Sequence, residues 1–124
     1  MVGFISDEVF DQGLDYADTN GVRLDITFTK QATTYTEATS TYTCGNDTVN
    51  TGTTEAGATT GRRVIIPAIT AGTGTAAQTA GWWALTDGAA VLIAAGALSA
   101  TQAVTSGNNF TLDAISITLK DPTA

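Results

Sequence analysis

Histidine is absent from this sequence, and its absence removes most of the chemistry that enzymes use. Histidine is the commonest general base, the partner that serine and cysteine nucleophiles need in most catalytic triads, and a frequent zinc ligand. The acidic residues gather near the N-terminus or stand singly in expected turns, where solvation is their ordinary role. We therefore expect no enzymatic activity, no cofactor and no metal.

Basic residues are also scarce. Five Lys and Arg residues stand against twelve Asp and Glu residues, and the formal net charge is −7. Affinity for a phosphate backbone comes from the counterions that Lys and Arg displace. Because so few cations are present, we expect no nucleic-acid partner.

Long apolar runs and cysteine pairs are missing as well. The longest apolar run, Ala89–Leu98, has about half of the roughly 20 residues that a membrane-spanning helix needs, so no membrane association is expected. No basic segment precedes Asp7, and we expect no secretory signal peptide. Cys44 is the only cysteine, which excludes an intrachain disulfide and fits a reducing compartment. A buried, inert thiol is the expectation.

The residues that are abundant favour strands. Only 14% of the 124 residues are charged, and Thr, Gly, Ala and Ser make up much of the remainder. A chain of this length is most economically one domain, here residues 1–124. We expect an all-β fold with one short N-terminal helix, arranged as an antiparallel β-sandwich or a small barrel.

The N-terminal segment has the pattern of a helix. Ser6 precedes two acidic residues, which is typical of a helix start, and Asn20-Gly21 is a natural stop. We expect a helix over Asp7–Asp18. One apolar stripe at helical spacing is expected to contact protein while the acidic side faces water: Val9, Phe10, Leu14 and either Tyr16 or Ala17.

The next segments change to a period of two. Val22–Thr29 alternates apolar and polar residues, as a strand with one buried face requires. Thr33–Thr43 is rich in Thr and Tyr and can continue as a second strand. Gly45–Gly61 is rich in Gly, Asn and Thr, and we expect an extended loop or arm that becomes ordered only against a neighbouring subunit.

Strand character returns at Arg62–Thr70, where Pro67 indicates an edge strand or a bulge, and the Gly72-Thr-Gly74 stretch is expected to end it. Asp87-Gly88 is the dipeptide favoured in tight two-residue hairpins. It lies between the expected strands Thr79–Thr86 and Ala89–Ala95.

A second hairpin is expected at the turn Ser106–Asn109, between Thr101–Thr105 and Phe110–Leu119, which would make this half an antiparallel meander. Within the last strand the apolar residues change from even to odd positions near Ala114. Either a bulge or burial on both faces would explain the change.

Two short motifs resemble ligand loops but fail at essential positions. Gly72–Ala77 follows a strand as a dinucleotide-binding loop does, yet a hairpin follows it where a helix is needed. Asp18–Gly21 resembles part of a calcium loop whose first ligand would fall at Tyr16 and whose final glutamate would fall at Thr27. Both segments are interpreted as turns.

Trp82-Trp83 is the most informative pair, because adjacent strand residues point to opposite faces. If one indole lies in the core, the other lies outside it, where it either covers a neighbouring segment or contacts another subunit. The candidates for protein contact are the tryptophans and the apolar N-terminal residues: Phe4, Val9, Phe10, Trp82 and Trp83.

Several blocks of this sequence together resemble small structural proteins of tailed bacteriophages: Thr33–Thr39, Gly61–Val64, Trp83–Gly88, and Leu98–Asn108 leading into Phe110–Leu112. The likeness covers most of the chain. It implies a virion component of the capsid decoration or cement type, synthesised in the host bacterial cytoplasm and assembled onto the head. The implied partner is the major coat protein, and the implied state is a homo-oligomer, with a trimer as one option. The resemblance carries no catalytic residues.

A different class of function stays open beside this one. A tail, collar or head-fibre module would bind the host surface, and a glycan site would use exposed aromatic rings. The obvious candidates for such rings are Trp82, Tyr35 and Tyr42. Copy number in the particle separates the two classes, because a decoration protein is present in hundreds of copies.

Overall fold

The computed structural model describes residues 6–50, 55–56 and 61–119, and the side chains of Asp7 and Phe10 are outside the description. Phe4 also lies outside the described residues. The elements in chain order are α1 (Asp7–Asn20), β1 (Arg23–Thr27), η1 (Glu37–Thr41), β2 (Thr43–Thr48), β3 (Glu55–Ala56), β4 (Arg62–Ile66), β5 (Ile69–Gly74), β6 (Gln78–Thr86), β7 (Leu92–Val104), β8 (Asn109–Leu112) and β9 (Ile115–Leu119).

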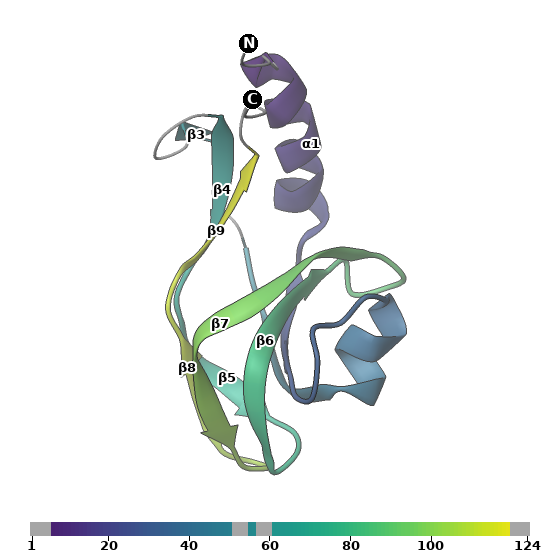
Figure 1. Cartoon of the computed structure of the whole chain (residues 1–124), viewed down its shortest axis with the longest axis vertical. Coiled ribbons are helices and arrows are strands. Elements are labelled where there is room, and N and C mark those ends of the chain that lie inside the picture. The colour runs from purple at the N-terminus through teal and green to yellow at the C-terminus, as the bar shows by residue number, and fades with distance from the viewer. Residues whose placement is uncertain (1–5, 51–54, 57–60, 120–124) are drawn as a thin grey trace.

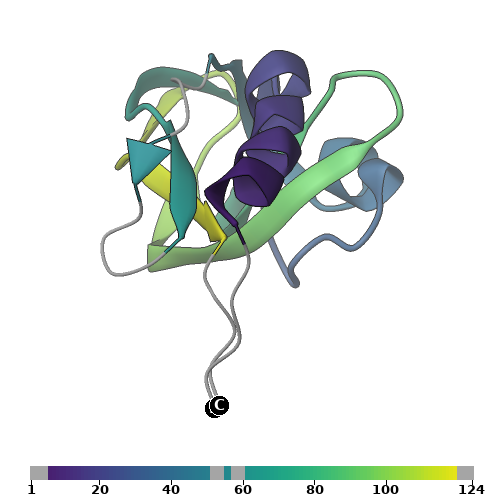
Figure 2. The same cartoon turned by 90° about the horizontal axis from the view of Figure 1, so that it is seen from above.

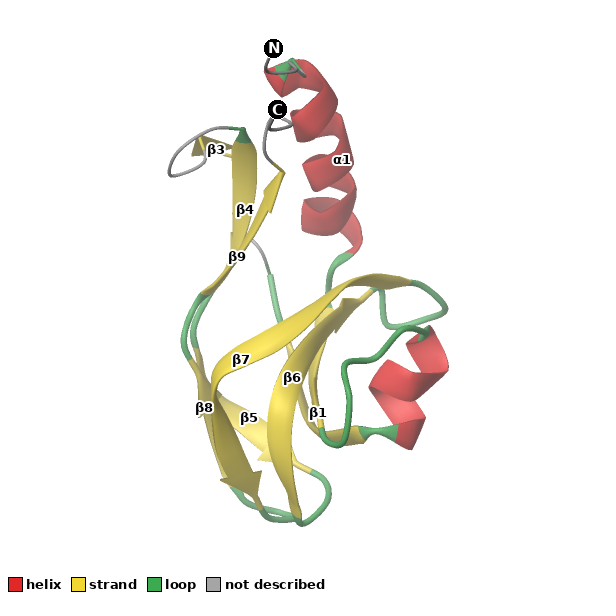
Figure 3. Ribbon diagram, in the orientation of Figure 1, coloured by secondary structure: helices red, strands yellow, loops and turns green. Residues whose placement is uncertain are grey.

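The strands form two antiparallel sheets. The large sheet has the order β7-β6-β1-β2-β5-β8 and curls on itself, and the small sheet has the order β3-β4-β9 (Figures 1 and 3). The view from above in Figure 2 places α1 beside the small sheet. The expected mainly-β fold, with a curled sheet of the kind found in small barrels and sandwiches, is confirmed.

Helix α1 begins and ends where its capping residues predict. The Ser6 hydroxyl accepts a hydrogen bond from the Val9 amide at 3.4 Å, and the Gly21 amide donates to the Ala17 carbonyl at 2.8 Å. Leu14 and Ala17 are buried against Val64 of β4. The apolar stripe is only partly covered by this chain, since Val9 is 62% exposed. The end of the stripe that contains Val9 therefore lies exposed on the protein surface.

Strand β1 is buried on both faces, so the expectation of one buried face is wrong. It lies between β6 and β2 at the centre of the large sheet. Asp25 and Thr27 are fully buried together with the apolar Leu24 and Ile26. The loop that carries η1 covers this second face, where Ala32 and Ala38 pack on Ala84, the residue opposite Asp25. Because β1 lies at the centre of the sheet and this loop covers its second face, neither face is exposed to water.

Thr33–Thr43 is not a second strand. Residues Glu37–Thr41 form a wide helical turn, in which the Tyr42 amide donates to the Glu37 carbonyl at 2.9 Å. The Glu37 carboxylate accepts hydrogen bonds from the Thr33 amide (2.9 Å) and hydroxyl (2.7 Å) and from the Lys30 ammonium (2.9 Å). These local bonds compete with strand pairing, and the Thr-rich composition did not reveal them.

The expected arm Gly45–Gly61 begins inside the large sheet, which corrects its first boundary. Strand β2 runs through Thr48, pairs with β1 and β5, and Gly45 is buried. The Phe110 ring lies so close to Gly45 that a methyl group there would sit 2.9 Å from the ring. Glu55-Ala56 pairs with β4, and residues 51–54 and 57–60 lie outside the described residues.

A two-stranded ribbon passes from the large sheet into the small one. The expected strand Arg62–Thr70 is divided at Pro67-Ala68 into β4 and β5, and β5 continues to Gly74. The last strand is divided at Asp113-Ala114 into β8 and β9. Because β5 pairs with β8 while β4 pairs with β9, the two breaks lie side by side. The break explains the change of apolar phase near Ala114.

The first expected hairpin is present with a longer turn. Strands β6 and β7 are paired, but the Asp87 amide bonds the Val91 carbonyl at 3.1 Å, so the turn spans five residues. The Asp87 carboxylate accepts the amides of residues 89, 90 and 91, each at 2.9 Å, and these bonds lower the pKa of Asp87. Gly88 has a φ of 74°.

The second hairpin turn exists, but its strands do not pair, so the meander prediction is wrong. Strand β8 pairs with β5, and β7 has only β6 as a strand partner. The Gly74 amide donates to the Asn108 carbonyl (2.8 Å) and the Gly107 amide to the Gly74 carbonyl (2.9 Å). These bonds hold the turn on β5, and the chain that leaves it runs along β5.

Candidate functional site

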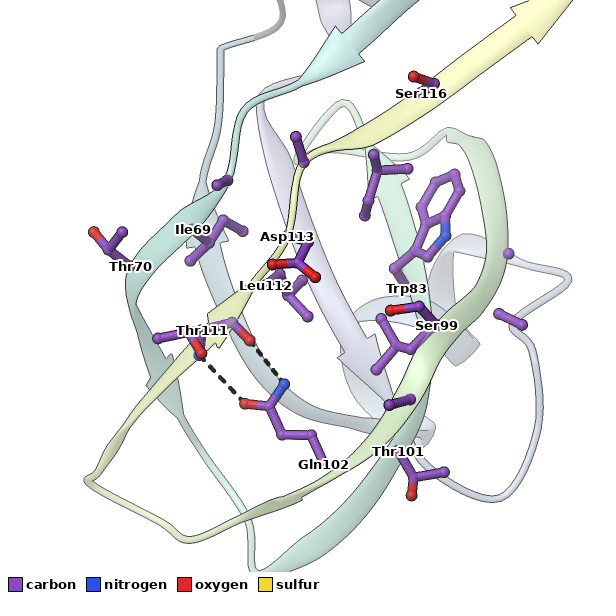
Figure 4. Close-up of a pocket in the computed structure, with 17 residues that line it drawn as sticks. Ile69, Thr70, Trp83, Ser99, Thr101, Gln102, Thr111, Leu112, Asp113 and Ser116 are labelled. Atoms are coloured by element: carbon purple, nitrogen blue, oxygen red, sulfur yellow. Dashed lines mark hydrogen bonds between the residues drawn. The ribbon is translucent and has the colours of Figure 1, made fainter.

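The two edges of the large sheet face each other across a slot of about 740 Å³ (Figure 4). One wall is β7 and the other is the β8–β9 segment. Among the described residues, no backbone hydrogen bond joins these walls. The lining residues come from five strands and two connections: Ala68, Ile69, Thr70, Trp83, Gly96, Ala97, Leu98, Ser99, Ala100, Thr101, Gln102, Thr111, Leu112, Asp113, Ala114, Ile115 and Ser116.

The slot is closed at both ends by contacts between its walls or their common neighbours. At one end the Gln102 amide side chain substitutes for a strand pair, because its nitrogen donates to the Thr111 carbonyl at 2.8 Å and its oxygen accepts the Thr111 amide at 3.3 Å (Figure 4). At the other end Ile93 of β7 and Ile117 of β9 pack on the same buried cluster around Leu14. The opening is a window of limited length.

The β7 wall contains a large bulge. In the β6–β7 ladder, Ala80 faces Gln102 and Trp82 faces Ala97, so the four residues Leu98–Thr101 lie opposite Gly81 alone. Bulges bend a strand away from its regular course and interrupt its outer edge. The stretch 92–104 also contains no charged residue and no proline. The β7 rim of the slot is thus uncharged and irregular.

The base of the slot is apolar and its rims are polar. Trp83, Ile69 and Leu112 are buried members of the main core cluster that also line the slot. Gly96 lets the Trp83 indole lie against β7, since a methyl group there would be 2.9 Å from the indole nitrogen. The rims carry hydroxyl groups, and Asp113 is the one ionisable lining residue.

The tryptophan pair divides as strand geometry requires. Trp83 is buried at 9% exposure and lines the slot, whereas Trp82 is half-buried on the other face of β6. Tyr35 and Tyr42 are half-buried too, and the Tyr42 ring makes an edge contact with Phe28, with ring centroids 6.0 Å apart. The structure brings Trp83 to the slot and does not bring Val9 there.

The described basic residues are engaged in separate ion pairs. Each of the four described Lys and Arg residues has an acidic partner: Arg23 with Asp25, Lys30 with Glu37, Arg62 with Asp11, and Arg63 with Glu55. The hydrogen bonds from Thr33, with help from Lys30, lower the pKa of Glu37 to about 2. The described part of the chain holds no cluster of three or more potential metal ligands.

Cys44 is buried, as the sequence predicts. Its thiol donates to the Ile26 carbonyl at 3.6 Å. Burial, with a smaller effect from the negative charge of Asp25, raises the pKa of the thiol to about 11. A neutral thiol is a poor nucleophile and a poor metal ligand, so this side chain has a packing role.

Sequence reasoning missed three features of the slot: the long strand β7, the Gln102 bridge and the position of Asp113. The uncharged stretch from Leu92 to Val104 is the signal that points to an unprotected edge. No helix among the described residues is long and apolar enough to cross a membrane. Comparison of the chain with protein-family models, curated proteins and solved structures finds no match.

Proposed function

We propose that this chain is a non-enzymatic structural protein of tailed-bacteriophage particles, a decoration or cement protein that binds the coat lattice of the head. The observation that carries the proposal is the resemblance of several sequence blocks to small phage structural proteins. Two of these blocks, Trp83–Gly88 and Leu98–Asn108, supply Trp83 and much of the β7 wall of the slot. The resemblance and the candidate contact surface thus share part of their residues.

The distribution of charge supports a role in contact. The described Lys and Arg residues lie in four separate ion pairs, and the slot offers main-chain edges, hydroxyl groups and apolar surface. Surfaces of this kind bind other proteins. A decoration protein needs affinity for the assembled lattice above its affinity for free coat subunits, because such a difference stabilises the assembled state by linkage. Each copy can then contribute modestly at its own junction.

Copy number in purified particles tests the proposal. Quantitative mass spectrometry of the chain against the major coat protein should give hundreds of copies per particle. Particles that lack the chain should rupture at lower temperature, or under milder osmotic shock, than complete particles. A handful of copies would reject the decoration role and favour the tail, collar or head-fibre module. Equal particle stability with and without the chain would reject the cement role as well.

A reconstruction of the particle by cryo-electron microscopy tests the homo-oligomeric state together with the position. Density for the chain on the outer face of the head, repeated at the local symmetry axes, is the expected result. A trimer would place the chain at threefold positions. Density confined to the tail or the neck would contradict the proposal.

A further inference from the structure

We propose that the slot between β7 and β8–β9 binds a short extended segment of a different protein, which inserts as a strand between the two edges. The segment is apolar at alternate positions and carries one Lys or Arg residue that pairs with Asp113. This proposal does not depend on which particle or assembly contains the chain.

Strand edges without a strand partner on both walls of the slot favour an extended peptide. Neither β7 nor the β8–β9 segment has a strand partner on the side that faces the slot. An added strand satisfies main-chain donors and acceptors and places alternate side chains in pockets. Here those side chains would meet Trp83, Ile69 and Leu112 at the base. The chemistry of the slot therefore matches a strand better than a polar small molecule.

The length of the window limits the segment to a few residues. The wall from Thr111 to Ser116 comprises six residues, which in extended form span about 20 Å at ~3.3 Å per residue. The walls are bridged by Gln102 at one end and share a buried cluster at the other. The volume of about 740 Å³ lies within the range of specific ligand sites, about 300–1,000 Å³.

Two observations favour a different protein over a second copy of this chain. The bulge at Leu98–Thr101 interrupts the β7 edge, and two bulged edges do not form a continuous ladder with each other. Every described Lys and Arg side chain already has an acidic partner within the chain, so a second copy brings no unengaged described cation to Asp113. The net charge of −7 also gives an acidic second copy no electrostatic attraction to the Asp113 side of the slot.

Asp113 gives the site its charge preference. It lies at the break between β8 and β9, it is exposed, and it is the one ionisable residue of the lining (Figure 4). No hydrogen bond or ion pair to its side chain is present within the described residues. A basic residue of the bound segment would supply the missing partner, and an acidic residue would be repelled.

Two matched hexapeptides test the proposal by NMR titration of the full isotope-labelled chain. Both have capped ends and alternate valine with threonine; one threonine is replaced by lysine in the first peptide and by glutamate in the second. We expect amide shifts confined to residues 96–102 and 111–116, with millimolar or tighter affinity. The lysine peptide should bind on the order of three- to tenfold more tightly than the glutamate peptide, as expected for an exposed pair.

Variants with matched controls separate the contribution of the Asp113 charge from that of the space in the slot. Asp113→Asn should remove the preference for lysine, whereas Asp15→Asn, an exposed acid on α1, should leave it unchanged. Ala114→Arg should block binding of both peptides, whereas Ala89→Arg in the β6–β7 turn should not. Unchanged amide resonances of the central strand β1 report that each variant is folded. Shifts spread over other surfaces, a lysine preference that survives Asp113→Asn, or no shift at millimolar peptide would each overturn the proposal.

Discussion

The Phe110 ring is held between two glycines, and this contact makes a sharp stability prediction. A methyl group at Gly72 on β5 would lie 2.3 Å from Cζ of Phe110, and one at Gly45 on β2 would lie 2.9 Å from Cε1. Carbon atoms in contact prefer about 3.5–4.0 Å, so in Gly72→Ala the ring or the strand must move by about 1 Å or more. The ring is 3% exposed and belongs to the main buried core cluster.

Overpacking of this kind costs about 1–3 kcal/mol of unfolding free energy. For a domain of this size we expect the Tm of Gly72→Ala to fall by roughly 4–12 °C. Chemical unfolding followed by tryptophan fluorescence measures the free energy directly. The matched control is Gly81→Ala on β6, where the nearest atom to the added methyl group is 4.0 Å away. The control should be neutral or stabilising by up to about 1 kcal/mol.

A double-mutant cycle tests the cause. Phe110→Leu removes the ring atoms that meet the new methyl group, so Gly72→Ala should cost less in the Phe110→Leu background than in the wild type. We expect a coupling energy of about 1–2 kcal/mol. Strictly additive effects, or a Gly72→Ala variant as stable as Gly81→Ala, would refute the reasoning that the ring fills the space above Gly72.

Three further predictions concern charged and reactive groups. Arg23→Ala leaves the buried Asp25 carboxylate without its cation, so we expect the free energy of unfolding to fall by about 2–3 kcal/mol in chemical unfolding. Arg63→Ala, at an exposed pair, should cost less than about 1 kcal/mol, and equal losses would contradict this reasoning. Because the pKa of Glu37 is lowered from 4.5 to about 2, its contribution to the stability of the fold is present above pH 4.5 and is lost as the pH falls toward 2. The difference in unfolding free energy between wild type and Glu37→Gln should therefore shrink over that pH range. A constant difference from pH 6 to 2 would speak against this reasoning. The Cys44 thiol should react with an aromatic disulfide reagent at pH 8 only after unfolding, since its pKa is raised to about 11, and rapid labelling of the native protein would disprove its burial.

The elements that local chemistry controls could be predicted from the sequence. The Ser6 cap and the Gly21 stop defined α1, and the change of apolar phase located the break at Ala114. The Asp87-Gly88 signal placed the β6–β7 hairpin, although the carboxylate of Asp87 organises a longer turn than the dipeptide alone indicates. These features depend on residues that are close in sequence.

Features that depend on distant contacts could not be predicted. Strand β8 follows β5 because Gly74 holds the preceding turn, and no local pattern at Ser106–Asn109 reports this contact. The helical turn η1 depends on Glu37, whose hydrogen bonds with Thr33 and Lys30 outweigh the strand propensity of a Thr-rich segment. The slot also depends on contacts between distant parts of the sequence, because it forms where the edges of β7 and β8–β9 do not pair.

An exposed pair of edges carries a risk of aggregation, and the molecule limits that risk without closing the slot. Natural proteins protect edges with charges, prolines, bulges or a covering segment. Strand β7 has no charge and no proline, so its bulge and the Gln102 bridge provide the protection seen in this structure. A complete ladder of hydrogen bonds between β7 and β8 would be a simpler way to protect both edges. A chain that instead keeps a short window between an uncharged β7 edge and Asp113 is suited to pairing with a segment of another protein.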